Sequence, residues 1–341
     1  MGFNPQEVFN KSNQPAEKRN NATIYKTNPK NSVSEDGHYH SQIRVLLNPF
    51  NLERSIVHQA TYAMTDGDGF FMVKSALGDG DKNCPLFRAW KQLWFSGDNE
   101  KKEWSKQKFD KSETDWVLVQ IIEDENQPEL TGQFKVMKMP KAIMSRLQAK
   151  MNPTDGKKAP QPIMDYLFGP VLEMNVTPGP DDPANPGRKN REISYDLCDF
   201  ANDPTPIISV DGTPLFNEDE MEVIETYAQA QADILKAKTE GKRKAAEEVK
   251  ASLSGEVRKL YEKALEYMKS NALDLVDECA YKPWSDNVTA RVNAWIEAVL
   301  NMEDPLNVTT HTKTEEVKQS EGKASASAPV KPESSDDDLP F

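Results

Sequence analysis

Lysines and aromatic residues are interleaved from residue 95 to residue 116, and this pattern suits a surface that holds unpaired nucleic-acid bases. Lysines neutralise phosphates, and flat rings stack on bases of any type. The residues of this stretch are Phe95, Lys101, Lys102, Trp104, Lys106, Lys108, Phe109, Lys111 and Trp116. The spacing fits equally well with rings in a core and lysines on a solvated face, so it leaves both interpretations open.

The segments that follow predict the elements that would position such a surface. Residues 117–122 form an apolar run typical of a buried strand, and residues 133–139 form a second one after a polar loop. The two runs predict a hairpin. Pro140 suits the first turn of a helix, which would carry Ile143 and Leu147 on one face.

Further short strands are predicted on both sides of this hairpin. Residues 41–47 alternate in polarity, and residues 56–64 and 70–77 flank an Asp-Gly-Asp-Gly turn, which is a strong hairpin signal. Strands are also expected over residues 171–176 and 191–198, and helical segments over 84–94 and 162–168. The sequence therefore predicts a mainly β fold with added helices, in which residues 38–212 form a Greek-key barrel of the OB type.

The two ends of the chain differ from this core in composition. Residues 1–37 are polar and Asn-rich, and they predict a basic flexible arm. Residues 213–305 contain three helical patterns, over 218–252, 254–281 and 287–302, which indicate either a small bundle or a partner-binding arm. Residues 306–341 have the composition of a disordered tail.

The net charge of −13 is unevenly distributed along the sequence. Residues 1–30 carry 5 Lys and Arg against 2 Asp and Glu, whereas residues 212–305 carry 12 against 19. A local basic groove is therefore compatible with an acidic chain, because the field depends on placement. Three widely spaced cysteines indicate a reducing compartment, and the absence of a long apolar run predicts no membrane span.

The last six residues combine acidic and apolar side chains. They are Asp336, Asp337, Asp338, Leu339, Pro340 and Phe341. Such a segment can place its Phe in an apolar pocket with a basic rim, while the aspartates steer the encounter. The sequence therefore predicts a partner-binding tip at the end of the tail.

Two resemblances connect these features. The six-residue tip resembles the acidic tip of bacterial single-stranded DNA-binding proteins. The core resembles the helix-destabilising, single-stranded DNA-binding proteins of T-even phages over about 160 residues, with loops of different length. The similar segments are residues 42–46, 83–85, 97–99, 116–124, 132–135, 141–143 and 195–196.

The resemblance implies a sequence-independent single-stranded DNA-binding protein of phage replication, recombination and repair, in the cytoplasm of an infected bacterial host. It implies an OB core for DNA, a basic arm for cooperative self-association, and an acidic end that recruits replication and repair proteins. The DNA-binding candidates in this sequence are Lys74, Arg88, Phe95, Lys101, Lys102, Trp104, Lys106, Lys108, Phe109, Lys111, Phe134, Lys138, Arg191 and Tyr195.

This chain departs from the family at its zinc site, which uses one His and three Cys. His58 and Cys84 match two of these ligands, and Phe87 stands where the second Cys of a CxxC pair would be. A structural zinc site needs four ligands, so we expect no zinc or other cofactor.

Two other functions compete with DNA binding. A scaffold or adaptor would act through residues 218–302 and the tail without DNA. A nuclease would use Asp66, Asp68, Asp79 and Asp81, but these lie in Gly-rich turns, which favours solvated loops. The sequence contains no nucleophile–base pair, so we expect binding and not catalysis.

Overall fold

The computed structural model describes residues 23–29, 32–154, 159–179 and 193–309. Their strands form one mixed eight-stranded sheet with the order β1-β6-β5-β2-β7-β8, to which β3 and β4 are attached through β5. Only the β1–β6 pair is parallel among the pairings of these strands. The strands are β1 (Ile24–Tyr25), β2 (Tyr39–Leu46), β3 (Ile56–Asp66), β4 (Gly69–Ser75), β5 (Asp110–Asp124), β6 (Phe134–Met139), β7 (Pro170–Val176) and β8 (Asp199–Pro204).

The long strand β5 holds two parts of the molecule together. Its first half, Asp110 to Val117, pairs with β3, and its second half, Leu118 to Asp124, pairs with β2. The apolar run after residue 116 is buried from Val117 to Ile121 because both faces of β5 are covered there, and Ile122 is partly exposed. Val117, Val119 and Ile121 enter one core, whereas Trp116 and Leu118 enter others on the opposite face.

The sheet curls around the first of these cores without closing. Tyr25 of β1 and Phe200 of β8 stand at opposite ends of the strand order, yet both pack in the same cluster. No pairing joins β1 to β8 among the residues that the structure describes. The mainly β architecture with added helices is confirmed, but the closed Greek-key barrel is not.

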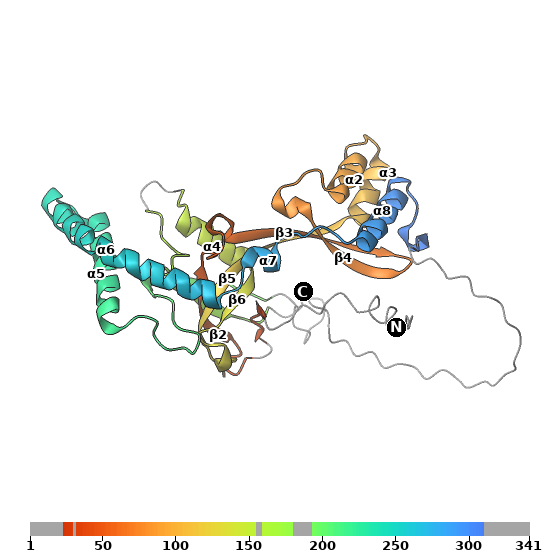
Figure 1. Ribbon diagram of the computed structural model, residues 1–341. Coiled ribbons are helices and arrows are strands. Elements are labelled where there is room, and N and C mark those ends of the chain that lie inside the picture. The colour runs from red at the N-terminus through yellow and green to blue at the C-terminus, as the bar shows by residue number, and fades with distance from the viewer. Residues whose placement is uncertain (1–22, 30–31, 155–158, 180–192, 310–341) are drawn as a thin grey trace, which may run out of the picture.

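The helices cover different parts of this sheet. Helix α4 (Lys141–Met151) packs Ile143 and Leu147 into the central core, as the sequence predicted. Helices α5 (Glu218–Lys236) and α6 (Glu240–Asn271) form an antiparallel hairpin that projects from the sheet (Figure 1). Val257, Leu260 and Ala264 attach α6 to the sheet, while the first half of α6 extends beyond it.

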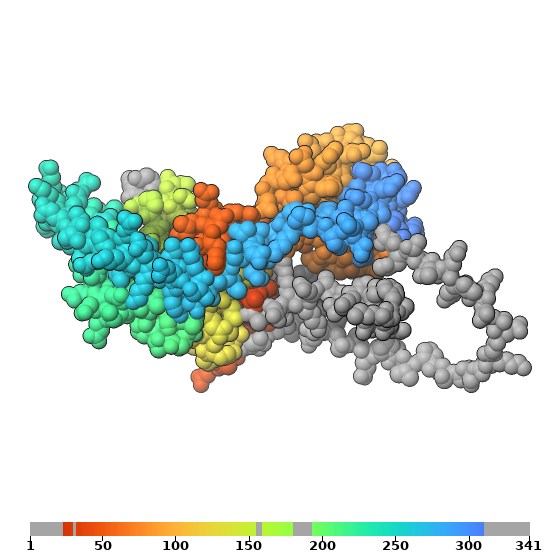
Figure 2. Space-filling model, in the orientation of Figure 1, coloured from red at the N-terminus to blue at the C-terminus, as the bar shows by residue number. Residues whose placement is uncertain are grey.

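A second lobe lies at the other end of the molecule, around the β3–β4 hairpin (Figure 1). It contains α2 (Pro85–Trp94), α3 (Asn99–Lys108) and α8 (Asp286–Leu300), which bury Leu86, Trp295 and their neighbours against Tyr62 of β3. Figure 2 shows residues 272–300, which include α7 (Leu275–Cys279), as a band that crosses the surface from α6 to this lobe. The short 3-10 helices are Leu52–Arg54, Ala76–Asp79, Pro128–Leu130 and Pro305–Asn307.

Several sequence-based boundaries differ from the structure. Ile24–Tyr25 forms a strand within the predicted arm, because its backbone pairs with Val136 and Met137. The helical region breaks at residues 237–239 and not near Leu253, and its helices divide between two lobes. Residues 191–198 do not form a strand in the described part: Ser194 makes one bridge to Thr177, and β8 begins at Asp199.

Candidate nucleic-acid interface

Three aromatic rings form a ladder along one stripe of α2. The ring centroids of Phe87 and Trp90 are 5.7 Å apart, those of Trp90 and Trp94 are 5.4 Å apart, and both pairs are stacked. The spacing of three and four residues places them on one helical face. Leu86, Ala89 and Leu93 point into the core instead, so the ladder residues remain half-buried at the edge of the lobe.

Phe95 extends the ladder into solvent. It follows α2 directly, its side chain is 68% exposed, and its ring meets that of Trp90 edge-on at 6.2 Å. Gly97 then turns the chain with a φ of +79°, a conformation that suits glycine, and Asp98 caps α3. This tight connection brings the lysines of α3 back over the rings of α2.

Lys102 and Lys106 of α3 lie over the outermost tryptophan. Their Nζ atoms are 4.9 Å and 5.7 Å from the centre of the Trp94 ring, within the range of a cation–π contact. Lys106 also forms an ion pair of 2.6 Å with Glu103. We call Phe87, Trp90, Trp94, Phe95, Lys102 and Lys106 the aromatic–lysine surface.

This surface has the two chemical properties that an unpaired strand requires. The exposed Phe95 offers a ring face of the kind that stacks on a base, whereas the partly exposed Trp94 stacks on Trp90 and lies under the two lysines. The lysine side chains are long enough to follow phosphates nearby. Arg88 of α2 is exposed beside the ladder and adds a fixed positive charge. Phe95, Lys102, Lys106 and Arg88 were predicted from the sequence, and the structure brings them into one lobe.

Other predicted stacking residues belong to the core. Phe109 and Phe134 are only 7% and 6% exposed, because Phe109 packs against Tyr62 and Trp295, and Phe134 lies beside Tyr267. So little of either ring is exposed that neither offers a base a free face in this structure.

Trp104 and Tyr195 are half-buried and already have partners. Trp104 donates its indole N–H to the carbonyl oxygen of Val299 at 3.0 Å, and it packs in the core of the second lobe. Tyr195 packs on the central core, where burial raises the pKa of its hydroxyl. The core interpretation of Trp104 is therefore the better one, because α8 occupies its edge.

Several predicted cations are engaged by protein groups. Lys74 donates to the carbonyl oxygens of Cys279 and Ala280 at 3.0 Å and 3.3 Å, so it anchors the end of α7. Lys108 pairs with Asp304 at 3.2 Å, and Lys111 pairs with Glu113 at 2.5 Å.

The remaining predicted residues are less constrained or lie elsewhere. Lys138 is exposed on β6, and Lys101 is half-buried on α3. Arg191 and the tip residues Asp336, Asp337, Asp338, Leu339, Pro340 and Phe341 lie outside the described residues.

Sequence analysis missed the ladder itself. Residues 84–94 were predicted only as a helical segment, without a distinction between its aromatic and aliphatic side chains. A finer division was available, because residues 87, 90 and 94 follow a stripe that is rotated from the stripe of 86, 89 and 93. The site could have been predicted from the stripe of aromatic residues 87, 90 and 94, which runs beside the stripe of aliphatic residues 86, 89 and 93.

A second exposed apolar pair lies on the other face of the β3–β4 hairpin. Phe70 and Met72 of β4 are 65% and 47% exposed, whereas the next residue, Val73, points to the opposite face and is buried in the second lobe. The alternation of the strand explains this difference, since neighbouring side chains point to opposite faces. Phe70 is therefore another ring that is accessible to a base.

The acids of the nuclease alternative do not gather into a metal cluster in the part of the chain that the structure describes. Both oxygens of Asp66 are bound by Arg291, and Asp79 pairs with Arg54. His58 is exposed and contacts Asp115 at 2.9 Å, while Cys84 is buried with its sulfur 2.9 Å from the Ser75 hydroxyl. Among the described residues, none of these groups is part of a cluster of three ligands.

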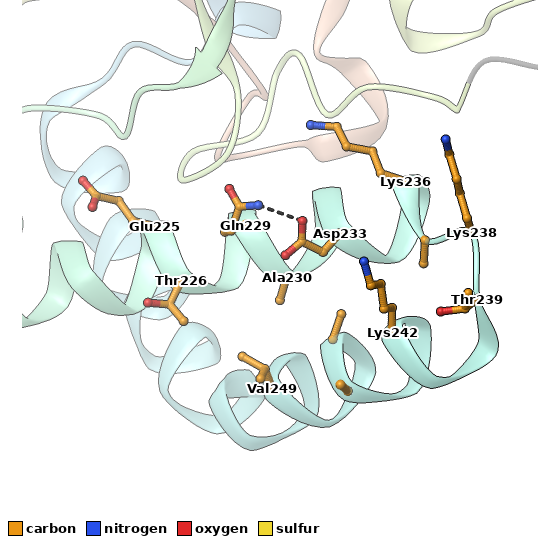
Figure 3. Close-up of a pocket in the computed structure, with 13 residues that line it drawn as sticks. Glu225, Thr226, Gln229, Ala230, Asp233, Lys236, Lys238, Thr239, Lys242 and Val249 are labelled. Atoms are coloured by element: carbon orange, nitrogen blue, oxygen red, sulfur yellow. Dashed lines mark hydrogen bonds between the residues drawn. The ribbon is translucent and has the colours of Figure 1, made fainter.

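A cavity of about 1090 Å³ lies between α5 and α6, at the free end of their hairpin. Figure 3 shows Lys236, Lys238 and Lys242 at its loop end, with Ala230 and Val249 between the helices. Small apolar side chains, among them Ala230, Ala246 and Val249, line its floor. Its basic rim suits an acidic partner segment better than a nucleic-acid base.

Neither a known family model nor a curated protein sequence matches this chain. Within the described residues, no helix has the length and apolar character needed to cross a bilayer.

Proposed function

We propose that this chain is a sequence-independent single-stranded DNA-binding protein that protects and organises unpaired strands during phage DNA replication, recombination and repair. The observation that carries the proposal is the aromatic–lysine surface: a stacked ladder of three rings, an exposed Phe95, and two lysines within 6 Å of Trp94. Stacking is tolerant of sequence because every base has a π-face.

The mechanism needs no bond to be made or broken. A base stacks on Phe95 or Trp94, and Lys102 and Lys106 move from the Trp94 ring to the phosphates of the bound strand. Each neutralised phosphate releases condensed counterions, which makes the affinity strongly dependent on salt. The protein thus acts by binding, and the cellular site that fits this role is the cytoplasm of an infected bacterial host.

The fold supports this proposal in a second way. The sheet curls so that β1 and β8 share one core, which is the arrangement expected of a Greek-key barrel of the OB type that is incompletely closed. We infer that residues 38–212, joined by β1, provide this core, with β4, α2 and α3 of the second lobe inserted between β3 and β5. The basic N-terminal residues would add cooperative self-association on DNA, and the acidic tip would recruit replication and repair proteins.

A fluorescence titration of the full chain with thymidine oligonucleotides, at several salt concentrations, tests the function. Binding should quench tryptophan emission, because Trp90 and Trp94 lie at the proposed surface, and it should weaken steeply as salt rises. A folded protein that fails to bind at low salt would refute the proposal.

The second candidate function is a scaffold or adaptor, and the cavity between α5 and α6 favours it. Three lysines of its rim could attract an acidic segment, and its apolar floor could receive the segment's side chains. Reversing the charge of Lys236, Lys238 and Lys242 to Glu in the full chain separates the two functions. An adaptor would lose its protein partners, whereas a DNA-binding protein would keep its affinity for thymidine oligonucleotides.

A further inference from the structure

Three potential metal ligands converge where the chain enters β2. The Asp36 carboxylate, His38 Nδ1 and His40 Nε2 each offer one atom, and these atoms all lie within 4.8 Å of one another. Asp36 Oδ2 is 3.0 Å from His40 Nε2 and 3.4 Å from His38 Nδ1. This cluster is separate from the aromatic–lysine surface and from His58 and Cys84.

The local sequence explains why the two imidazoles face the same way. In extended chain, alternate residues point to opposite faces. Tyr39 is 1% exposed and enters the central core, so His38 and His40 on either side of it must point outward. Gly37, with a φ of +71°, turns the preceding chain so that Asp36 folds back over both rings.

The two carboxylate oxygens of Asp36 make different contacts. Oδ1 accepts a hydrogen bond of 2.8 Å from the backbone N–H of His38, which fixes the orientation of the carboxylate. Oδ2 is then presented to the two rings.

We propose that Asp36, His38 and His40 form a binding site for a first-row divalent metal ion of the zinc class. Imidazole nitrogen and carboxylate oxygen are the donors that zinc accepts, at about 2.0–2.2 Å. Tetrahedral bonds of that length separate neighbouring ligand atoms by about 3.3 Å. The distances from Asp36 Oδ2 to the two nitrogens lie on either side of this value.

A fourth potential donor, an amide oxygen, lies beside the cluster. Asn175 of β7 is the cross-strand partner of His40, and its Oδ1 is 3.0 Å from His38 Nδ1. The amide oxygen, or a water held by it, completes the coordination. A structural site of this kind does not depend on the proposed DNA binding, because its ligands lie outside the lobe that carries the ladder.

The metal ion would fasten the segment before β2 to the sheet. That segment is already held by two hydrogen bonds, from the Ser32 hydroxyl to the His38 carbonyl and from the Val33 N–H to Asn126 Oδ1. A metal that bridges Asp36 to His40 adds a connection between the turn and β2. Since the unfolded chain does not preform this geometry, metal binding stabilises the folded state.

Calorimetric titration of the EDTA-treated, dialysed full chain with zinc chloride tests this inference. One zinc ion should bind, and His38→Ala, His40→Ala and Asp36→Asn should each weaken binding by at least about tenfold, a lower limit taken from the effects of outer-shell substitutions. His58→Ala is the matched control, because His58 has a carboxylate neighbour, Asp115, but no second imidazole in its cluster. It should bind zinc as the unchanged chain does.

Two further readouts keep the inference open to refutation. The midpoint of thermal unfolding should rise with zinc in the unchanged chain and in His58→Ala, and not in His38→Ala or His40→Ala. With cobalt as the probe, the absorption spectrum should lack a thiolate charge-transfer band, because Cys84, Cys198 and Cys279 are buried and none of them is a member of this cluster. No zinc binding, binding that survives loss of both histidines, or a thiolate band would overturn the assignment.

Discussion

Arg291 donates two hydrogen bonds of 2.7 Å to the two carboxylate oxygens of Asp66, although 225 residues separate them. Asp66 closes β3 at the Asp-Gly turn, and Arg291 lies on α8. The side chain of Asp66 is fully buried in this pair, whereas that of Arg291 is 24% exposed. The Asp-Gly turn at the end of β3 is therefore the attachment point of a C-terminal helix.

Removing the cation of this pair should destabilise the second lobe. Arg291→Ala leaves the buried carboxylate of Asp66 without its partner, which typically costs about 3–5 kcal/mol. Arg291→Lys should lose less, because it keeps the charge but not the two-pronged geometry. Urea unfolding followed by circular dichroism measures the difference, and equal stability of all three proteins would contradict the structure.

Trp94 and Trp104 form a matched pair for testing the ladder. Trp94→Ala should weaken binding of a thymidine oligonucleotide by about 1–3 kcal/mol and leave the fold intact, because a stacked base is lost. Trp104→Ala should instead lower the free energy of unfolding by up to about 3 kcal/mol, since it removes packing against α8. Fluorescence anisotropy of a labelled oligonucleotide and urea unfolding distinguish the two effects.

The reverse pattern would assign the DNA surface differently. If Trp104→Ala weakened DNA binding of a fully folded protein and Trp94→Ala did not, the base would stack beside α8. The ladder of α2 would then be a packing feature only.

Lys102 and Lys74 were both predicted to contact DNA, but they have different environments in the structure: Lys102 lies over the Trp94 ring, whereas Lys74 donates to backbone carbonyl oxygens. Lys102→Ala should reduce the slope of log affinity against log salt by about 0.7, the value for one phosphate of a single strand. Lys74→Ala should leave the slope unchanged, because its ammonium group is held by the carbonyl oxygens of Cys279 and Ala280. A titration of each variant at four salt concentrations gives the slopes.

Local signals predicted much of the sheet. The Asp-Gly turn specified the β3–β4 hairpin, the apolar run after Trp116 specified β5, and Pro140 specified the start of α4. Each of these depends on residues that are close in sequence, so the pattern contains the information. The register of β5, which divides its pairing between β3 and β2, is a long-range property that the pattern does not contain.

Helix α3 was missed because it has almost no apolar face. Ser105 is its one fully buried residue, so hydrophobic periodicity could not reveal it, although Asp98 was available as a capping residue. The docking of α8 on the hairpin was also beyond local reasoning, because it depends on contacts more than 200 residues apart, such as Trp295 to Thr65. These contacts decide which aromatic rings are core.

The start of α5 should make stability depend on pH. The hydrogen bond from Lys263 holds the pKa of Glu220 below its usual value, and the Asn217 backbone N–H adds to the effect. A lowered pKa means that this stabilisation is present above about pH 4.3, the usual Glu value, and is lost as pH falls through the folded-state pKa.

Glu220→Gln tests this dependence. At pH 7 the variant should unfold at lower urea concentration than the unchanged chain, and the gap should shrink as pH falls below about 4. Glu222→Gln, at an exposed position of the same helix, is the control. A gap that stays constant down to pH 2 would show that the ion pair between α5 and α6 does not contribute.

Variants of the acidic tip can distinguish two roles for it, recruitment of protein partners and competition with DNA for the lysines. Replacing Asp336, Asp337 and Asp338 by Asn should tighten DNA binding at low salt, because an internal polyanion no longer competes for Lys102 and Lys106. Phe341→Ala should leave DNA affinity nearly unchanged and reduce capture of replication proteins, since an apolar anchor supplies most of the docking energy.

Oligonucleotide titration at low and high salt, and affinity capture with mass spectrometry, measure the two properties on the same variants. The salt series matters because competition by aspartates is screened within about 8 Å at physiological ionic strength, so their effect should fade there. Phe341→Leu, which keeps apolar volume, should retain part of the capture. If Phe341→Ala captured the same proteins as the unchanged chain, the tip would act through its charge alone.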